Sequence, residues 1–328
     1  MDANWNIVGH AWAVDMLRQH VGRGTARHAY LFTGPRGVGR RTLALRFAQA
    51  LNCTDPPEPG IPCLKCNDCA RIQARQHPDV TIVEAEAEGA TLKVDQVREQ
   101  RRLLALKPFL GRFRVAIFLR FQEANDSAAN ALLKTLEEAP AYAVLILTAE
   151  SPEGLLPTIV SRCEVLRLHT VPLDAVQHLL EQHGAPPEQA RLMAHVSGGC
   201  PGTALRLVED KGALAYREEK LNELMALLAA TRAQRFAYAE KLGKDKTSMH
   251  AVLVLWLSFW RDVLWRAGGA STPISNLDRQ QEIDALARQL SLASAKRLVA
   301  DLDHALRRLE SNVNPRLLAE VLLLDWPR

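Results

Sequence analysis

The sequence has no long apolar run and no strong excess of charge of one sign. Its longest apolar stretch, Ala251–Trp260, has about half the length that a membrane-spanning helix needs, so we expect no membrane segment. The first residues, MDANWNIVGH, contain no basic region followed by an apolar stretch, so we expect no secretory signal. Lys and Arg exceed Asp and Glu by only four charges (41 against 37), which does not by itself indicate a nucleic-acid-binding protein.

The remaining composition is that of an ordinary soluble globular protein. Its 328 residues are 48% hydrophobic and 24% charged, and a chain of this length holds two or three domains. We expect a cytoplasmic protein. Thiols stay reduced in that compartment, so clustered cysteines indicate a metal site rather than disulfides.

To about residue 170 the chain alternates short β-rich runs with stretches of helical spacing. This alternation predicts an α/β domain in which a parallel sheet has helices on both faces. The predicted strands are Ala29–Thr33, Val80–Glu84, Arg114–Leu119, Ala143–Thr148 and Glu164–Leu168, and the predicted helices between them are Arg41–Ala50, Val94–Leu106 and Ala128–Glu138.

The rest of the chain is predicted to be helical. It begins with the short helices Leu173–His183 and Pro187–Val196. The run 251–266 is apolar nearly all round, which indicates a helix buried on several sides. Asn314 followed by Pro315 predicts the N-cap and first residue of the last helix. The expected fold class is therefore α/β followed by all-α.

Residues 34–42, GPRGVGRRT, follow an apolar strand and precede a helix, which is the context of a phosphate-binding P-loop. A plain strand–helix turn is the alternative, but glycines that let N–H groups face an anion at a helix N-terminus favour the P-loop fold. The residues concerned are Gly34, Gly37, Gly39, Arg40, Arg41 and Thr42. Arg40 stands where a lysine is expected and Arg41 where a hydroxyl for Mg²⁺ is expected, while Thr42 is one residue out of register.

The strand that would hold the metal is also altered. In an active site of this kind, carboxylates at the end of a second strand hold Mg²⁺ and orient water. Here the stretch Arg114–Phe121 has Leu119 and Arg120 at the positions where the carboxylates are expected. Glu123 follows too far along the chain to substitute for them. We therefore expect no functional ATP or Mg²⁺ site.

Four cysteines lie in a Pro- and Gly-rich stretch with the spacing C-x9-C-x2-C-x2-C. They are Cys53, Cys63, Cys66 and Cys69. Four thiolates at this spacing can surround one tetrahedral ion, so we expect one closed, structural Zn²⁺ site that organises residues 53–69. An iron–sulfur cluster is the main alternative, and disulfides are unfavoured in a reducing compartment.

A single arginine, Arg162 in TIVSRC, precedes the fifth predicted strand. The simplest interpretation is a surface side chain. At the nucleotide-facing end of the sheet, where we expect it, Arg162 would instead reach the ATP of a neighbouring subunit and stabilise developing charge there. The residue pattern alone leaves both interpretations open.

A series of short motifs runs along most of the chain. They are Val8–His10 (VGH), His28–Thr42, Ala50–Cys53 (ALNC), the cysteine knuckle, Asn130–Pro140 (NALLKTLEEAP), Ser161–Cys163 (SRC) and Asn312–Leu318 (NVNPRLL). Together they resemble the bacterial clamp-loader branch of the AAA+ proteins, which holds an ATPase, gamma/tau, and an inactive relative. The ATPase has Lys-Thr at Arg40 and Arg41, Asp-Glu at Leu119 and Arg120, and a sensor arginine at Gly202, so these departures resemble the inactive relative.

The resemblance implies three domains: an AAA+ RecA-like α/β domain with the zinc knuckle (1–168), a helical lid (169–208) and a helical collar for oligomerisation (209–328). It also implies a subunit without ATPase activity in the DNA polymerase III holoenzyme, a nucleotidyltransferase. The implied partners are gamma/tau and delta and, through the complex, the β sliding clamp and primed DNA, with no membrane. The chain would act as a stator, with Arg162 as an arginine finger in trans to gamma/tau.

Two other functions stay open. An active ATPase of the gamma/tau kind would grip phosphate with Arg40 and show Mg²⁺-dependent turnover, against which the missing carboxylates argue. A zinc-dependent nucleic-acid binder would interleave basic and aromatic residues around the metal, whereas this loop has Lys65 among Asp55, Glu58 and Asp68.

Overall fold

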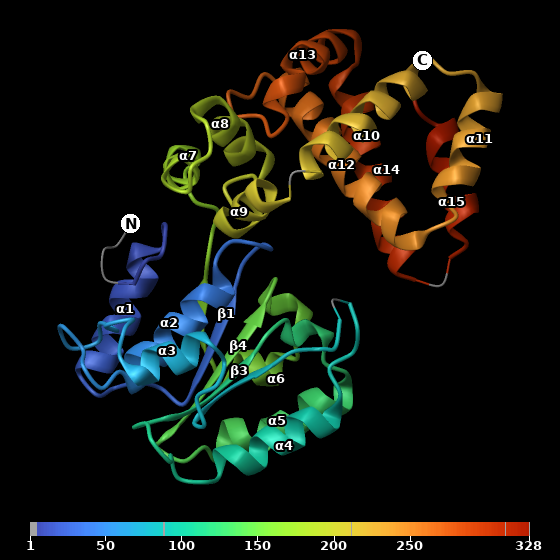
Figure 1. Cartoon of the computed structure of the whole chain (residues 1–328). Helices are drawn as coiled ribbons and strands as arrows, with labels where there is room; N and C mark the ends of the chain where they lie inside the picture. Colours follow the sequence, from blue (N-terminus) through green and yellow to red (C-terminus); the bar gives the residue numbers. More distant parts are fainter. Residues whose placement is uncertain (1–4, 88, 211, 312, 328) are drawn as a thin grey trace. The chain divides into compact units, whose positions relative to one another are not determined.

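A computed structural model of the protein describes residues 5–87, 89–210, 212–311 and 313–327, which belong to two compact units (Figure 1). One unit comprises Met1–Leu179 with Gly199–Thr203, and the other comprises Leu180–Gly198 with Ala204–Arg328. The segment 169–208 is divided between the units, and its assignment as a separate lid stays a prediction. Asn312, the first residue of the predicted collar motif, lies outside the described residues. In the part of the chain described, no helix is long and apolar enough to cross a membrane.

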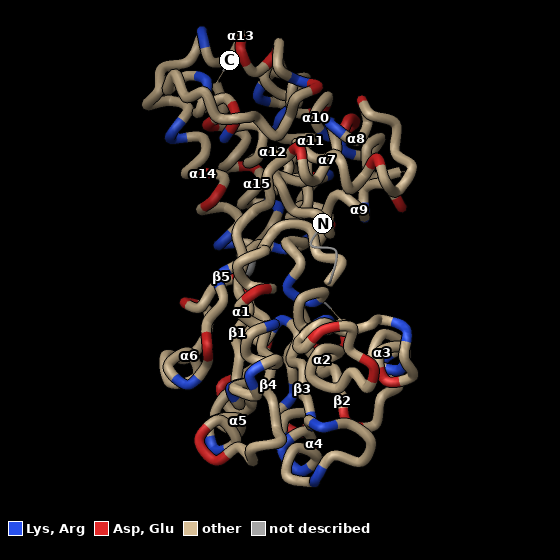
Figure 2. Tube along the Cα trace, turned by 90° about the vertical axis from the view of Figure 1, so that its left-hand side faces the viewer, with Lys and Arg blue, Asp and Glu red and all other residues tan. Residues whose placement is uncertain are grey.

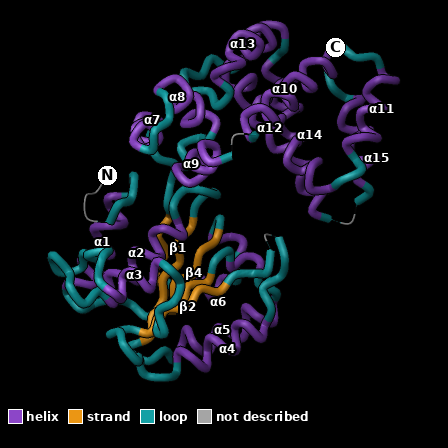
Figure 3. Tube along the Cα trace, viewed as in Figure 1, coloured by secondary structure: helices purple, strands orange, loops and turns teal. Residues whose placement is uncertain are grey.

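The first unit is built on a five-stranded parallel sheet, whose strands are orange in Figure 3. The strand order is β2-β3-β4-β1-β5. The strands are β1 Ala29–Thr33, β2 Val80–Val83, β3 Arg114–Phe118, β4 Ala143–Ala149 and β5 Glu164–Arg167. Every residue of β1, β3 and β4 is buried, as expected for parallel strands that are covered on both faces. The predicted strands are therefore confirmed, and each predicted end lies within one residue of the observed end.

Helices cover both faces of this sheet. They are α1 Ala11–Gly22, α2 Arg40–Asn52, α3 Asn67–Gln73, α4 Val94–Leu104, α5 Asp126–Glu137 and α6 Pro157–Val160, with the short 3-10 helices η1 Phe121–Glu123 and η2 Pro152–Gly154. Successive residues of a strand point to opposite faces. Tyr30 and Phe32 of β1 accordingly pack with Phe47 of α2 in one core, while Leu31 packs with Leu132 of α5 in the other. The predicted α/β architecture is confirmed.

From α7 onward the described chain is helical, which confirms the all-α second part. The helices are α7 Leu173–Gln182, α8 Pro187–Val196, α9 Pro201–Glu209, α10 Ala213–Leu228, α11 Arg232–Leu242, α12 Lys246–Ala267, η3 Leu277–Arg279, α13 Gln280–Gln289, α14 Leu292–Glu310 and α15 Pro315–Leu324. Trp256, Phe259 and Trp260 of α12 are fully buried, and both tryptophans meet Trp326 edge-on at centroid distances of 5.0 and 6.0 Å. Val254 is 46% exposed, so α12 is buried on several sides but not all round.

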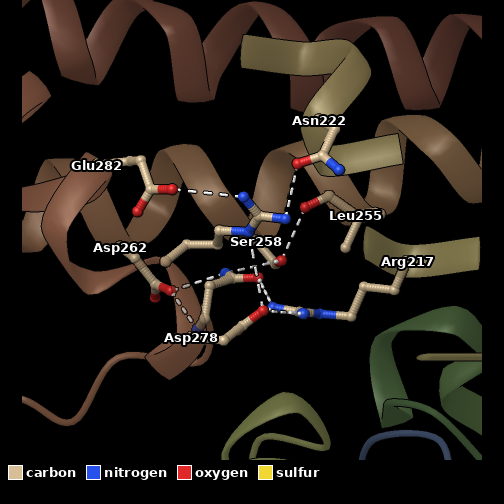
Figure 4. A network of polar contacts seen from close by, with 9 residues as sticks. Arg217, Asn222, Leu255, Ser258, Asp262, Asp278 and Glu282 are labelled. Atoms are coloured by element: carbon tan, nitrogen blue, oxygen red, sulfur yellow. Dashed lines mark hydrogen bonds and ion pairs between the residues drawn. The ribbon is translucent and has the colours of Figure 1, made fainter. Parts of the chain in front are cut away.

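Buried polar groups fix the stretch that connects α12 to α13 (Figure 4). The fully buried carboxylate of Asp262 accepts the backbone N–H of Ser275 at 3.1 Å and the backbone and side-chain N–H of Asn276, both at 2.8 Å. Arg217 of α10 donates to both oxygens of Asp278 at 2.7 and 2.8 Å. A charge is tolerated in a core only when it is paired or hydrogen-bonded in this way. This Gly- and Ser-containing stretch is therefore held against the helices of its own unit.

Candidate functional site

The P-loop lies between β1 and α2, as the sequence predicts. Gly34 follows the last residue of β1, and Gly39 is the N-cap of α2. Gly37 between them has a φ of 76°, a left-handed conformation that glycine adopts without strain. β1 lies between β4 and β5 within the sheet, and open α/β sheets bind ligands beyond the carboxyl ends of such strands. The strand–loop–helix context of a P-loop is therefore present.

A segment of the same unit, Gly199–Thr203, packs against this loop. The N–H of Gly202 donates to the carbonyl of Gly37 at 2.7 Å, and Thr203 Oγ1 donates to the carbonyl of Arg36 at 3.3 Å. A Cβ on Gly37 would lie 2.2 Å from Thr203 Oγ1, so the contact requires glycine. The position at which the resembling ATPases carry a sensor arginine thus supplies a backbone donor that ties the loop to this segment.

Arg40 occupies the position of the P-loop lysine but is only 9% exposed, and its Nη1 has no hydrogen-bond partner among the described residues. Burial lowers the pKa of Arg40; Glu150 opposes this shift, and Arg36 and Arg120 add to it. Two further arginines and one carboxylate therefore act on Arg40, and this excess of positive charge disfavours a divalent cation. The next two residues of the loop, at positions 41 and 42, are exposed.

The end of β3 offers no carboxylate at the metal-binding positions. β3 ends at Phe118, followed by the buried Leu119 and by Arg120, whose φ of 50° is left-handed. Arg120 Nε donates to Glu123 Oε1 at 2.9 Å, and its Nη1 lies 3.5 Å from Glu84 Oε2. Glu123 therefore neutralises an arginine. The positions that hold Mg²⁺ in an ATPase of this type present an apolar side chain and a cation.

Two contacts near the loop are not singled out by the sequence pattern. Glu150 follows β4 and accepts the N–H of Gly34 on its carbonyl at 3.1 Å, while its carboxylate acts on Arg40. His10 Nε2 lies 3.1 Å from the carbonyl of Val38. A signal for Glu150 exists, because residues that directly follow parallel strands gather at one edge of the sheet.

The four predicted metal ligands form one cluster, in which the Sγ atoms all lie within 4.8 Å of one another. Cys53 Sγ lies 3.5 Å from Cys63 Sγ and 4.0 Å from Cys66 Sγ. A tetrahedral ion with Zn–S bonds of about 2.3 Å holds its sulfurs about 3.8 Å apart. Cys53 is the C-cap of α2 and Cys66 is the N-cap of α3, so two helix ends position the sulfurs. The donor set and its spacing fit one Zn²⁺.

Backbone N–H groups point at these sulfurs. The N–H of Cys63 donates to Cys53 Sγ at 3.3 Å, that of Cys66 to Cys63 Sγ at 3.2 Å, and that of Cys69 to Cys66 Sγ at 3.4 Å. Burial raises the pKa of the Cys53 and Cys69 thiols. For Cys66 burial is outweighed by hydrogen bonds from Thr54 and from the N–H of Cys69, and the pKa falls to about 6. Such donors favour the thiolate, which is the form that binds metal.

Arg162 lies where the amino ends of the strands meet (the amino edge of the sheet), whereas the P-loop lies where their carboxyl ends meet (the carboxyl edge). The expectation that Arg162 stands at the nucleotide-facing end is therefore wrong. It precedes β5, whose first residue, Glu164, pairs with Tyr30 near the start of β1. A residue before a strand lies at the amino end of that strand, and β1 and β5 are parallel, whereas Gly34 follows the carboxyl end of β1. The Arg162 side chain is 37% exposed, and its Nη2 donates to Glu137 Oε1 at 2.7 Å.

Two family matches cover most of the chain. Residues 9–172 match the family described as DNA polymerase III, delta subunit, and residues 211–328 match the family described as DNA polymerase III, delta subunit, C terminal. Among solved structures, a DNA polymerase III gamma subunit-related protein of Thermotoga maritima covers 95% of this chain and 97% of its own, with 20% identity and a TM-score of 0.48.

Curated relatives match at nearly full length. DNA polymerase III subunit delta' of Pseudomonas aeruginosa is 31% identical over 97% of this chain and 97% of its own length. The delta' subunit of Bacillus subtilis is 28% identical over 94% of this chain and 93% of its own length. The tau/gamma subunit of Haemophilus influenzae is 33% identical over 75% of this chain, but over only 37% of its own length. The chain therefore belongs to the delta-prime family of DNA polymerase III clamp-loader subunits.

Proposed function

We propose that this clamp-loader subunit has no ATPase activity of its own and acts as a stator that supplies Arg162, as an arginine finger, to ATP bound by an adjacent gamma/tau subunit. The observation that carries the proposal is Arg120. Where a metal-binding carboxylate is needed, this chain has a cation that is paired with Glu123. In this role the subunit contributes position and charge to the loader, and the nucleotide is held elsewhere.

The electrostatics of the P-loop support the absence of hydrolysis. Phosphoryl transfer depends on a compact ammonium at the phosphates, a hydroxyl on Mg²⁺ and a carboxylate for the metal. Arg40 has a planar guanidinium that does not fit a pocket shaped for an ammonium. The hydrogen bond from Gly202 to Gly37 also ties the loop to its own unit. Each feature alone would weaken nucleotide binding, and together they support an inactive site.

The surroundings of Arg162 support action on another chain. The side chain is 37% exposed and is held by an ion pair with Glu137, which is itself 50% exposed. An exposed pair of this kind contributes only about 0–1 kcal/mol, so it does not prevent a new contact. The P-loop of the same chain follows the carboxyl end of β1, at the other edge of the sheet. An anion supplied by a neighbour is therefore the better partner for Arg162.

The finger role is tested by Arg162→Ala in a loader reconstituted with gamma/tau and delta. An arginine finger in trans is worth on the order of 10³–10⁵ in rate, so hydrolysis at the adjacent site should fall by at least about a hundredfold. Assembly, measured by size-exclusion chromatography, should be unchanged. Arg27→Ala is the matched control, because Arg27 is also exposed and pairs with Glu164 at 2.8 Å. Unchanged hydrolysis in the Arg162 variant would contradict the role.

The absence of intrinsic activity has a separate test. The isolated protein should show no turnover of ATP with Mg²⁺. The alternative, an active gamma/tau-like ATPase, requires turnover that rises with protein concentration, stops with EDTA and is lost in Arg40→Ala. Such turnover would overturn the proposal.

We also propose that Cys53, Cys63, Cys66 and Cys69 hold one structural Zn²⁺. Four sulfurs close the coordination shell, so the ion would order the loop and have no part in catalysis. Metal analysis should find about one zinc per chain, and Cys66→Ala should lose it and lower the melting temperature. Cys163→Ala, outside the cluster, should keep the metal. An iron chromophore in the purified protein would instead favour an iron–sulfur cluster.

We further propose gamma/tau and delta as direct partners, with the β sliding clamp and primed DNA reached through the complex, in the bacterial cytoplasm where replication takes place. Basic and acidic residues are interspersed along the chain (Figure 2), which fits the small net charge of +4 and gives no reason for strong DNA binding by this subunit alone. Co-expression with gamma/tau and delta should yield one complex on sizing. A subunit that elutes alone would count against these partners.

A further inference from the structure

We propose that Glu137 is a positioning residue for Arg162, whose carboxylate holds the guanidinium in an orientation that leaves N–H groups free for a phosphate on a neighbouring subunit. This inference rests on the proposed finger role. The contact joins the last residue of α5 to the turn that follows α6, and these two helices pack against each other.

Three hydrogen bonds fix the guanidinium of Arg162. Its Nη2 donates to Glu137 Oε1 at 2.7 Å, and its Nη1 donates to the carbonyl of Thr158 at 3.0 Å and to Ser161 Oγ at 3.4 Å. A guanidinium has about five N–H donors in a rigid plane. These contacts use three of them, so the Nε–H and one Nη2–H have no partner among the residues that the structure describes. The guanidinium is thus held through Nη1 and one N–H of Nη2, and its other N–H groups can donate to a further acceptor.

Glu137 stands where a carboxylate is locally unfavourable. It is the last residue of α5, followed directly by Glu138, and the partial negative charge at a helix C-terminus favours cations over anions. The guanidinium of Arg162 offsets this repulsion at Glu137. Glu138 makes no ion pair in the part of the chain that the structure describes. A carboxylate at a helix C-terminus goes against the usual charge preference, and such exceptions are expected at functional sites.

The physical benefit of the contact is pre-organisation. A free arginine on a surface samples many rotamers, and fixing it before the neighbour arrives removes that entropy loss from the encounter. The planar fork allows one N–H to stay on Glu137 while the free N–H groups face a phosphate. Glu137 therefore acts on the rate through Arg162 and needs no contact with ATP.

The test uses the reconstituted loader and compares Glu137→Ala, Glu137→Gln and Glu138→Ala. Glu137→Ala should lower kcat for ATP about two- to fivefold with KM unchanged, which is the range that an exposed ion pair is worth. Glu137→Gln keeps an acceptor oxygen for Nη2 and should recover part of the lost rate. Glu138→Ala removes the neighbouring charge from the same helix end and should leave the rate unchanged.

The double variant Glu137→Ala with Arg162→Ala separates this inference from the finger role. If Glu137 acts through Arg162, the double variant should be no slower than Arg162→Ala alone. Wild-type rates in Glu137→Ala, or an equal loss from Glu137→Ala with and without Arg162, would overturn the positioning role while a loss in Arg162→Ala alone would leave the finger standing. If Arg162→Ala leaves hydrolysis unchanged, the finger role fails and the positioning role fails with it.

Discussion

The two edges of the five-stranded sheet hold arginines in opposite states. At the carboxyl edge, Arg40 is 9% exposed and lies beside a loop that is tied to its own unit by the hydrogen bond between Gly202 and Gly37. At the amino edge, Arg162 is 37% exposed and paired with one surface carboxylate, that of Glu137. The arginine at the carboxyl edge is thus enclosed within its own chain, whereas the arginine at the amino edge stays within reach of another chain.

This difference shows how a nucleotide-binding fold can stay intact when its chemistry is absent. The P-loop needs glycines for its shape whether or not a phosphate binds, because its backbone packs closely on Gly199–Thr203. The positions after β3 that hold Mg²⁺ in an ATPase carry no such structural requirement. Leu119 and Arg120 occupy them, and β3 is still formed. Fold and function are specified by different residues of the same site.

The largest effect among tests of this comparison is expected at the amino edge, for Asp79→Asn. Asp79 is fully buried, and its carboxylate accepts the N–H groups of Phe109, Leu110 and Gly111 at 2.7–2.8 Å and pairs with Arg114 at 3.0 Å. Loss of this charge should lower the free energy of unfolding by about 3 kcal/mol at neutral pH. Chemical denaturation measures it. An effect below about 0.5 kcal/mol would contradict a rigid amino edge.

The same carboxylate predicts a pH dependence. Burial raises the pKa of Asp79, but the three N–H donors and Arg114 outweigh it and hold the pKa below its usual range. A depressed pKa adds stability above the unfolded value of about 3.9, and this stability is lost as the pH falls from there through the folded value. Asp79→Asn should therefore flatten the loss of stability in acid. Asp95→Asn, at an 86% exposed side chain, is the control and should change little.

A smaller effect is expected at the carboxyl edge, for Gly37→Ala. Gly37 has a φ of 76°, and a Cβ there would lie 2.2 Å from Thr203 Oγ1. We expect a loss of about 2 kcal/mol from backbone strain and steric overlap. Gly24→Ala isolates the strain, because Gly24 has a φ of 67° and no atom within 4 Å of its Cβ position. Loader ATPase should be unchanged in both variants; a drop specific to Gly37→Ala would mean that this loop takes part in function.

The smallest effect, none at all, is expected when the P-loop alone is repaired. Arg40→Lys with Arg41→Thr restores the two replaced side chains, but Leu119 and Arg120 still leave the metal without a carboxylate. The isolated variant should show no Mg²⁺-dependent ATP turnover above a blank, and a thermal melt should establish that it is folded. Measurable turnover would show that the loop, and not the end of β3, limits activity.

Much of the fold follows from the sequence pattern. The strands β1, β3 and β4 are short, mostly apolar runs that are buried on both faces. The ends of all five strands are predicted within one residue. The cap of the last helix is confirmed as well, since the Asn314 side chain accepts the N–H groups of Arg316 and Leu317. Helices α1, α3 and α6 are not predicted. α3 is a seven-residue helix that starts at a cysteine in the metal loop, where helical periodicity is too short to detect.

The candidate site divides in the same way. The cysteine cluster is predictable because its ligands lie close together in the sequence, and its spacing alone suggests one ion. The pairing of Glu137 with Arg162 spans 25 residues and two elements, and the packing of Gly202 on Gly37 links distant segments. No periodicity or motif encodes such contacts.

The sequence by itself determined the strand–helix alternation, the strand–P-loop–helix context, the missing metal carboxylates and the metal-ligand spacing, because each depends on residues that are neighbours along the chain. Only the tertiary structure decided that Arg162 lies at the amino edge, that Gly199–Thr203 packs on the loop and that Glu137 holds Arg162. The physical reason is that the edge a residue occupies follows from parallel strand pairing, and contacts between remote segments follow from packing, neither of which leaves a local pattern.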